Sequence, residues 1–175
     1  MRYLLTILFA LGVSAYAGEG ADVNRQIHVD IDKVVETGKV EPVNGITSAG
    51  QPDAAALRVF AESGYSAVID MRGPNEDRGM DDFAGAVEGE GMSYIAFPIT
   101  SAEQLSLETA GELDAILGGI DGPVLLHCGS GNRVGAILAL RESLNGASDE
   151  EALEYGRDAG MTRSEALIKE RLGED

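Results

Sequence analysis

The stretch "PVLLHCGSGNRVGAILAL", from Pro123 to Leu140, has the pattern of a strand, a turn and a helix in succession. It begins as a short apolar run typical of a buried strand, and it ends in a segment that is apolar nearly all round, as in a buried helix. Between them lies a glycine-rich turn that carries Cys128, the only cysteine of the chain, and leads into Arg133. A strand–loop–helix unit of this kind predicts an anion-binding loop at the carboxyl end of a strand.

The rest of the chain repeats the alternation of strands and helices. Strands are expected around residues 46–48, 65–71 and 92–99, and helices around 53–64, 83–90, 107–120 and 133–144. Two short helices should close the chain, opened by capping boxes of Ser148 with Glu151 and Thr162 with Glu165. We therefore predict an α/β fold with a central, mostly parallel sheet flanked by helices, and sites just outside the carboxyl ends of its strands.

The turn after residue 127 is the strongest candidate site. Backbone N–H groups of Gly129, Ser130, Gly131 and Asn132 could form an anion-binding nest, and the helix N-terminus and Arg133 add positive charge that favours thiolate over thiol at Cys128. An inert buried thiol is the alternative. His127 should point away from the loop mouth and support the loop backbone, or be a plain core histidine, whereas His28 is expected on the surface.

The segments "HCGSGNR", "SAGQP", "VIDMRGPNE" and "YIAFPI" together resemble the phosphatase-like domain named after beta-lactamase-hydrolase-like proteins. This domain is a branch of the cysteine-based tyrosine and dual-specificity phosphatase superfamily, and the resemblance covers about residues 43–145. It implies a dual-specificity-phosphatase-like fold, a nucleophilic thiolate at Cys128 and an oxyanion-binding Arg133. It also implies that Arg72 could hold an anionic substrate while Glu76 orients Arg72 or a loop amide; an exposed ion pair is the alternative.

Three positions depart from the superfamily pattern. Four residues separate Cys128 from Arg133, where phosphatases of the superfamily have five, and Val134 stands where they have Ser or Thr. Ser101 stands where the general-acid aspartate should be, which leaves Glu103 as the nearest carboxylate and the candidate acid. A solvated loop charge is the alternative for Glu103.

The expected function is that of a cysteine-dependent hydrolase that cleaves a phosphoester through a phosphocysteine intermediate. The four-residue spacing also resembles the active loop of rhodanese-type sulfurtransferases, which need no general acid, so a persulfide carrier on Cys128 is the alternative. A non-catalytic protein that binds an anion or senses oxidants through the thiol is a third possibility.

Composition limits the partners and the location. The chain has 13 Lys and Arg against 30 Asp and Glu, a net charge of −17, which disfavours nucleic acids and anionic membranes. The expected partner, a small anionic or phosphorylated substrate, would have to be attracted by local dipoles and one or two arginines against this overall field. No cofactor is expected, and the two distant histidines suggest no metal site. Residues 1–17 have the pattern of a signal peptide cleaved after Ala17, with a membrane helix as the alternative, so we expect residues 18–175 to form a single secreted or periplasmic domain. The sequence does not indicate a partner protein.

Overall fold

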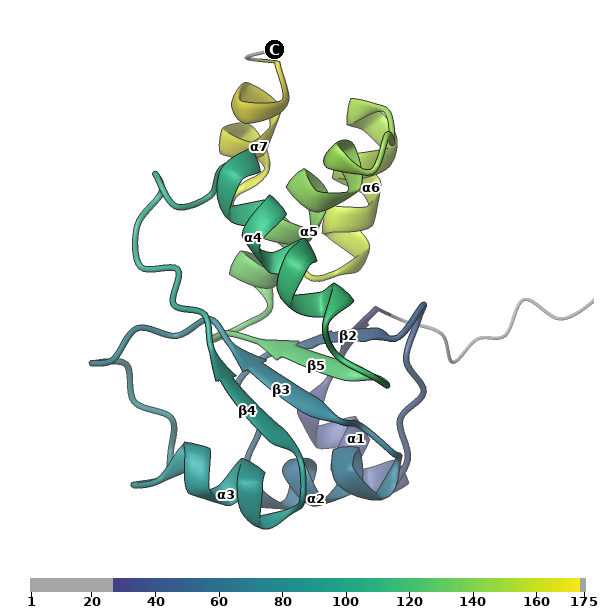
Figure 1. Ribbon diagram of the computed structural model, residues 1–175, viewed down its shortest axis with the longest axis vertical. Coiled ribbons are helices and arrows are strands. Elements are labelled where there is room, and N and C mark those ends of the chain that lie inside the picture. Colours follow the sequence, from purple (N-terminus) through teal and green to yellow (C-terminus); the bar gives the residue numbers. More distant parts are fainter. Residues whose placement is uncertain (1–26, 174–175) are drawn as a thin grey trace, which may run out of the picture.

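A five-stranded, entirely parallel sheet with the strand order β1-β2-β5-β3-β4 forms the centre of the molecule. The computed structural model describes residues 27–173 (Figure 1). Helices α1, α2 and α3 cover one face of the sheet and α4 to α7 cover the other. The elements are β1 (His28–Val29), α1 (Ile31–Thr37), β2 (Ile46–Ala49), α2 (Ala54–Glu62), β3 (Ala67–Asp70), α3 (Phe83–Gly89), β4 (Ser93–Ala96), α4 (Leu107–Gly118), β5 (Val124–His127), α5 (Asn132–Leu144), α6 (Asp149–Asp158) and α7 (Glu165–Leu172).

The predicted α/β class is confirmed, and the reason lies in the strands. Strand β5 is buried along its whole length, and its side chains alternate between two cores. Val124 and Leu126 pack with the helices α4 to α7, whereas Leu125 packs with α1 to α3. A strand covered on both faces is mostly apolar, which explains the apolar run of Val124, Leu125 and Leu126 before His127.

Helix α5 is the most buried helix, and α6 packs against it backbone to backbone. A Cβ atom on Gly135 would lie 2.3 Å from Met161 N and 2.4 Å from Gly156 O, so no side chain fits there. Glycine at positions 135 and 156 therefore allows the two helices to approach closely. This contact brings the segment after α6 to the N-terminal end of α5.

The N-terminal edge of the sheet was not predicted. Strand β1 pairs with β2, and Asp30 caps α1 by accepting a hydrogen bond from Lys33 N at 3.1 Å. The predicted surface position of His28 is wrong. The ring of His28 is half-buried, and its Nδ1 lies 3.2 Å from Ser48 Oγ. It is buried because it packs against Gly131 and Gly160, in the space that side chains at these two positions would need.

One of the two predicted capping boxes is confirmed and the other is wrong. Ser148 and Glu151 form a reciprocal capping box at the start of α6. Helix α7 instead begins at Glu165, after Ser164, and has no side-chain cap. Thr162 donates its backbone N–H to Asn132, which removes it from the helix start.

The predicted signal segment, residues 1–17, lies outside the described residues. Within residues 27–173, no helix combines the length and the apolar character needed to span a membrane.

Candidate active site

The segment from Cys128 to Arg133 lies at the carboxyl edge of the sheet and leads from β5 into the first turn of α5. Strand β5 is the central strand, so the loops that follow β2 and β3 flank it on both sides. Cys128 is 1% exposed, and its N–H donates to Ala49 O at 3.4 Å. A bridge between Gly50 and Ser130 ties the next part of the loop to the end of β2. The thiol is therefore held at the base of the loop.

The start of α5 has the features of an anion-binding helix N-terminus. Gly131 precedes the helix with φ +83°, a left-handed conformation that glycine adopts without strain. No side chain caps the helix start, although a helix leaves its first N–H groups without intrahelical acceptors. Together with the partial positive charge of a helix N-terminus, these groups favour an anion next to Cys128.

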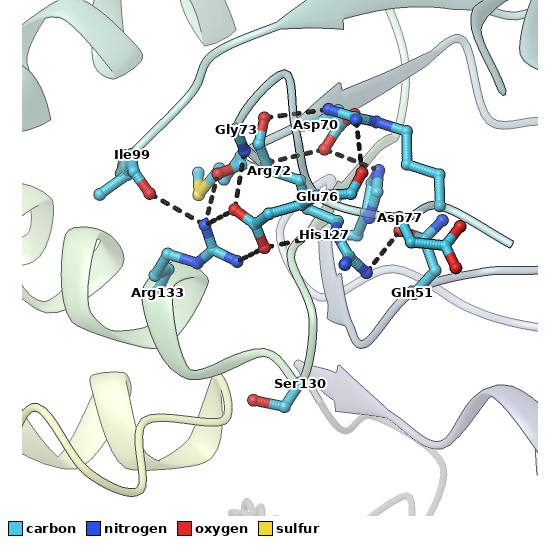
Figure 2. A network of polar contacts seen from close by, with 12 residues as sticks. Gln51, Asp70, Arg72, Gly73, Glu76, Asp77, Ile99, His127, Ser130 and Arg133 are labelled. Carbon is cyan, nitrogen blue, oxygen red and sulfur yellow. Dashed lines mark hydrogen bonds and ion pairs between the residues drawn. The ribbon is translucent and has the colours of Figure 1, made fainter. Parts of the chain in front are cut away.

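The carboxylate of Glu76 fixes the side chain of Arg133, a contact that was not predicted from the sequence. Arg133 donates from Nη1 to Glu76 Oε1 at 2.6 Å and from Nη2 to Glu76 Oε2 at 2.7 Å, a bidentate ion pair (Figure 2). Nη1 also donates to the carbonyl oxygens of Met71 at 3.1 Å and Ile99 at 2.9 Å. The three loops that follow β3, β4 and β5 therefore meet at one guanidinium group.

Glu76 and the two carbonyl oxygens occupy only part of the guanidinium, and the Cys128 side chain also interacts with it. Glu76 takes the Nη1–Nη2 edge, and the two carbonyl oxygens take the outer side of Nη1. Among residues 27–173, no oxygen atom accepts a hydrogen bond from Nε of Arg133. A Cβ atom on Gly129 would lie 3.9 Å from Nη2, so this part of the group lies close to the loop.

Glu76 is held from several sides. It accepts from Gly73 N at 2.8 Å, and its Oε2 lies 3.5 Å from Arg72 Nε. The hydrogen bond with Arg133 is the main cause that lowers the pKa of Glu76 from 4.5 to about 2. The predicted contact with a loop amide is thus present, but the closest cation is Arg133. Arg72 itself donates to Gln51 Oε1 at 3.0 Å.

Below the loop, Asp70 organises a buried polar cluster. It accepts from Arg78 Nε at 2.5 Å, Arg72 N at 2.8 Å and Tyr94 Oη at 2.9 Å, which anchors the loop after β3. The His127 ring is fully buried on the same face as Phe83, with ring centroids 5.0 Å apart, whereas Cys128 belongs to the core of the opposite face.

His127 is kept neutral by its surroundings. Neither ring nitrogen has a hydrogen-bond partner within the described chain, and Nε2 lies 3.4 Å from Asp70 Oδ1. Burial lowers the pKa of His127 to about 4, although the neighbouring Asp70 acts in the opposite direction.

Glu103 does not line the cavity next to Arg133. This cavity, of about 610 Å³, is lined by Arg133, by the loop after β3, by the loop after β4 and by α7 with the residue before it (Gly73, Pro74, Asn75, Glu76, Ile99, Thr100, Ser101, Ala102, Leu105, Arg133, Ser164 and Leu167). Glu103 is exposed, and a hydrogen bond with Ser101 lowers its pKa, which works against the protonated form that a general acid needs.

Asn132 joins the loop to the C-terminal segment. Its Oδ1 accepts from Thr162 N at 2.9 Å and Arg163 N at 2.7 Å, and its Nδ2 donates to Ser164 Oγ at 2.7 Å. The sequence predicts only a place in the anion-binding nest for Asn132. The contact between Glu76 and Arg133 was also missed, although both residues follow neighbouring strands whose carboxyl ends had to meet.

In the part of the chain that the structure describes, no group of three or more His, Cys, Asp or Glu side chains is arranged to hold a metal ion.

Comparison with known proteins gives sequence relatives of one kind. The chain is 28% identical over 129 residues to a Beta-lactamase hydrolase-like protein of Xylella fastidiosa strain Temecula1, and 28% identical over 122 residues to that of strain 9a5c. The aligned part is 69% of this chain but only 29% of the first relative, so the chain spans less than a third of that protein. No family model matches the chain.

Solved structures show the same fold. A candidate phosphatase from Neisseria meningitidis superposes with a TM-score of 0.61 at 19% identity, over 71% of this chain and 91% of that one. A candidate phosphatase from Shewanella putrefaciens gives 0.56 at 18% identity, over 81% and 96%. The structure of Tk-PTP in the active form gives 0.52 at 25% identity, over 73% and 90%. The chain thus resembles Beta-lactamase hydrolase-like proteins in sequence and has the fold of tyrosine-phosphatase-like proteins, which confirms the resemblance predicted from its motifs.

Proposed function

We propose that the protein hydrolyses a phosphoester through a covalent intermediate on Cys128. The observation that carries this proposal is the orientation of Arg133. Its guanidinium is fixed by Glu76 and two carbonyl oxygens, and its remaining edge lies near the loop that begins at Cys128. An arginine held in this way can bind two oxygens of a phosphoryl group without first losing side-chain freedom.

The reaction has two steps. The thiolate of Cys128 attacks phosphorus, the P–O ester bond breaks, and the departing oxygen leaves with the bonding electron pair and takes up a proton. Loop amides and Arg133 stabilise the charge on the phosphoryl oxygens during this step. Water then attacks the phosphocysteine, which releases inorganic phosphate and restores the thiolate.

Glu103 stays a candidate for the proton donor, and two observations restrict it. The side chain is exposed, and its pKa is lowered. General-acid help is worth about 10²–10⁴-fold, so an enzyme without it would favour esters whose leaving group needs no proton, such as activated aryl esters. A Glu103→Gln variant should then hydrolyse an activated aryl phosphate as fast as the original protein and an alkyl phosphate more slowly.

Sulfur transfer is the second candidate function, and Val134 favours it. Val134 is fully buried and has no hydroxyl that could assist the breakdown of phosphocysteine. A persulfide on Cys128 would need only the thiolate and the ring of N–H donors. In that reaction the thiolate takes a sulfane sulfur from a donor, and a second thiol or cyanide removes it.

One experiment separates the two reactions. The purified protein and a Cys128→Ser variant are each given an aryl phosphate and, separately, a sulfane-sulfur donor with cyanide as acceptor. We expect release of phosphate by the original protein alone, with a phosphoryl group on Cys128 detected by intact mass after rapid quenching. The mass of one extra sulfur on Cys128, with thiocyanate formation and no phosphate release, would overturn the phosphoester proposal in favour of sulfur transfer. Inertness of both proteins toward both substrates would favour the anion-binding or thiol-sensing role.

We also propose that the protein is exported, on the basis of the signal-peptide pattern in residues 1–17. N-terminal sequencing of protein recovered from its native host would give Gly18 as the first residue if cleavage follows Ala17.

A further inference from the structure

The segment that joins α6 to α7 lies directly against the candidate active loop. Asn132 accepts hydrogen bonds from the backbone N–H groups of Thr162 and Arg163 and donates one to Ser164 Oγ. These three bonds are 2.7–2.9 Å long, and the oxygen that accepts two of them comes from a residue that is 8% exposed. The backbone of Arg163 is therefore held in place by the loop that carries Cys128.

The side chain of Arg163 reaches back over this loop. Its Nη2 lies 3.5 Å from Ser130 Oγ, which is the outer limit of a hydrogen bond, and the side chain is exposed. In Figure 2 the Ser130 hydroxyl points to the side on which the pale yellow C-terminal segment lies. Within residues 27–173, no carboxylate lies within ion-pair distance of Arg163. Its guanidinium donors are thus available at the rim of the site.

Most other described arginines are already paired with carboxylates. Arg133 pairs with Glu76, Arg78 with Asp70, Arg141 with Asp114 and Arg157 with Glu165. In a chain with a net charge of −17, an unpaired guanidinium beside the loop attracts anions against the overall field.

A second cavity beside the loop is lined by carboxylates. It measures about 440 Å³, and Gly129 and Ser130 line it together with Asp30, Asp32 and Asp53. A substrate whose first anionic group occupies the loop would be repelled by these three carboxylates if a second anionic group pointed toward them. The same group pointing toward Arg163 would be attracted.

We infer that Arg163 binds a second anionic group on the substrate, next to the one held by the Cys128–Arg133 loop. The preferred substrate is therefore a phosphate ester whose leaving group carries a carboxylate or another anion close to the scissile bond. This inference rests on the proposed anion-binding role of the loop, and it makes Arg163 a specificity-determining residue.

The test uses two matched pairs of small molecules. Phenyl phosphate and 4-carboxyphenyl phosphate are compared as substrates, and benzylphosphonate and 4-carboxybenzylphosphonate are compared as non-hydrolysable ligands by calorimetric titration. We expect the original protein to bind the carboxylated phosphonate about threefold to tenfold more tightly, the range for one partly exposed charged contact. Arg163→Gln should remove this preference, and Arg163→Lys should keep most of it because the charge remains.

The matched control is Arg58→Gln, which removes an exposed arginine on α2 that pairs with Glu90. Arg58→Gln should leave the preference for the carboxylated phosphonate unchanged, because this preference depends on the contact with Arg163 and not on the net charge of the protein. Equal binding of the two phosphonates by the original protein, or an equal loss for both in Arg163→Gln, would overturn the inference. Binding without turnover of either ester would instead count against the hydrolytic function alone, because the titration needs no chemistry.

Discussion

The ion pair between Glu76 and Arg133 gives the sharpest prediction, tested by the substitution Glu76→Gln. The carboxylate accepts hydrogen bonds from both Nη atoms of Arg133, at 2.6 and 2.7 Å, and one from Gly73 N at 2.8 Å. Glutamine has nearly the same shape but only one acceptor oxygen, and its amide group would face an N–H of Arg133. One of the two contacts with the arginine is therefore lost, and the fixed orientation of the guanidinium with it.

The size of the effect follows from these contacts. A hydrogen bond to a charged group contributes about 1.5–3 kcal/mol, and solvent screening reduces this because the Glu76 side chain is 34% exposed. We expect the free energy of unfolding to fall by about 1–2 kcal/mol. A displacement of about 1 Å in a positioning group can lower a rate about 100-fold, so kcat/KM for an aryl phosphate should fall about tenfold to 100-fold.

Urea unfolding and steady-state hydrolysis measure the two quantities. The matched control is Asp114→Asn, which weakens the ion pair between Asp114 and Arg141, whose charged atoms are 2.7 Å apart. It should cost less than about 1 kcal/mol and leave kcat/KM unchanged. If Glu76→Gln retains the kcat/KM and the stability of the original protein, Glu76 does not orient Arg133 and the reasoning is wrong.

The pH dependence of the same variant gives an independent check. The pKa of Glu76 is lowered in the folded protein to about 2, so its contribution to stability is present above its unfolded pKa of 4.5 and is lost as the pH falls through about 2. The stability difference between the original protein and Glu76→Gln should therefore persist at pH 5 and shrink between pH 4.5 and 2. A difference that disappears already between pH 7 and 5 would point to another titrating group.

Three further predictions concern packing, the loop anchor and the buried histidine. Gly135→Ala should lower the free energy of unfolding by about 3 kcal/mol, because the new methyl group meets backbone atoms. Gly111→Ala in α4, where the nearest neighbour of the new methyl group is 3.9 Å away, should raise it by about 0.5–1 kcal/mol. Thermal unfolding that ranks the two variants in the opposite order would contradict both predictions. Asn132→Ala leaves two backbone N–H groups without their acceptor and should cost about 2–3 kcal/mol in urea unfolding, and an unchanged midpoint would contradict the assigned contacts. Burial lowers the pKa of His127 in the folded protein from 6.5 to about 4. The stability of the protein should therefore be complete above pH 6.5 and decline by about 3 kcal/mol as the pH falls to 4 and the unfolded chain takes up the proton. His127→Phe should show a smaller decline over this range, and an equal decline would mean that other groups cause it.

The sequence predicted the central part of the fold because its signals are local. The apolar run before Cys128 needs two covered faces, and the glycines that follow it permit a tight turn into a helix, so β5, the loop and α5 could be placed from sequence alone. The alternation of strands also placed His127 and Cys128 on opposite faces of the sheet, as the structure has them.

Contacts between distant segments could not be predicted in the same way. Glu76 is four residues from Arg72, which suggested an ion pair between these two, but the parallel arrangement of β3 and β5 brings Arg133 closer. The contact of Asn132 with the segment after α6 depends on the close packing of α5 and α6, for which the sequence shows only isolated glycines. Strand β1 has two residues, too few for any periodicity to be recognised.

The position of His28 has a practical consequence for how the protein can be shortened or fused. Its ring fills the space beside Gly131 and Gly160, so β1 supports the loop that holds Cys128 through this packing contact. A truncated protein that starts after Val29 would keep every residue of the proposed chemistry and still lose this packing contact. Domain boundaries for expression or for fusion to another protein should therefore be set before residue 27, even though the motifs themselves begin about twenty residues later.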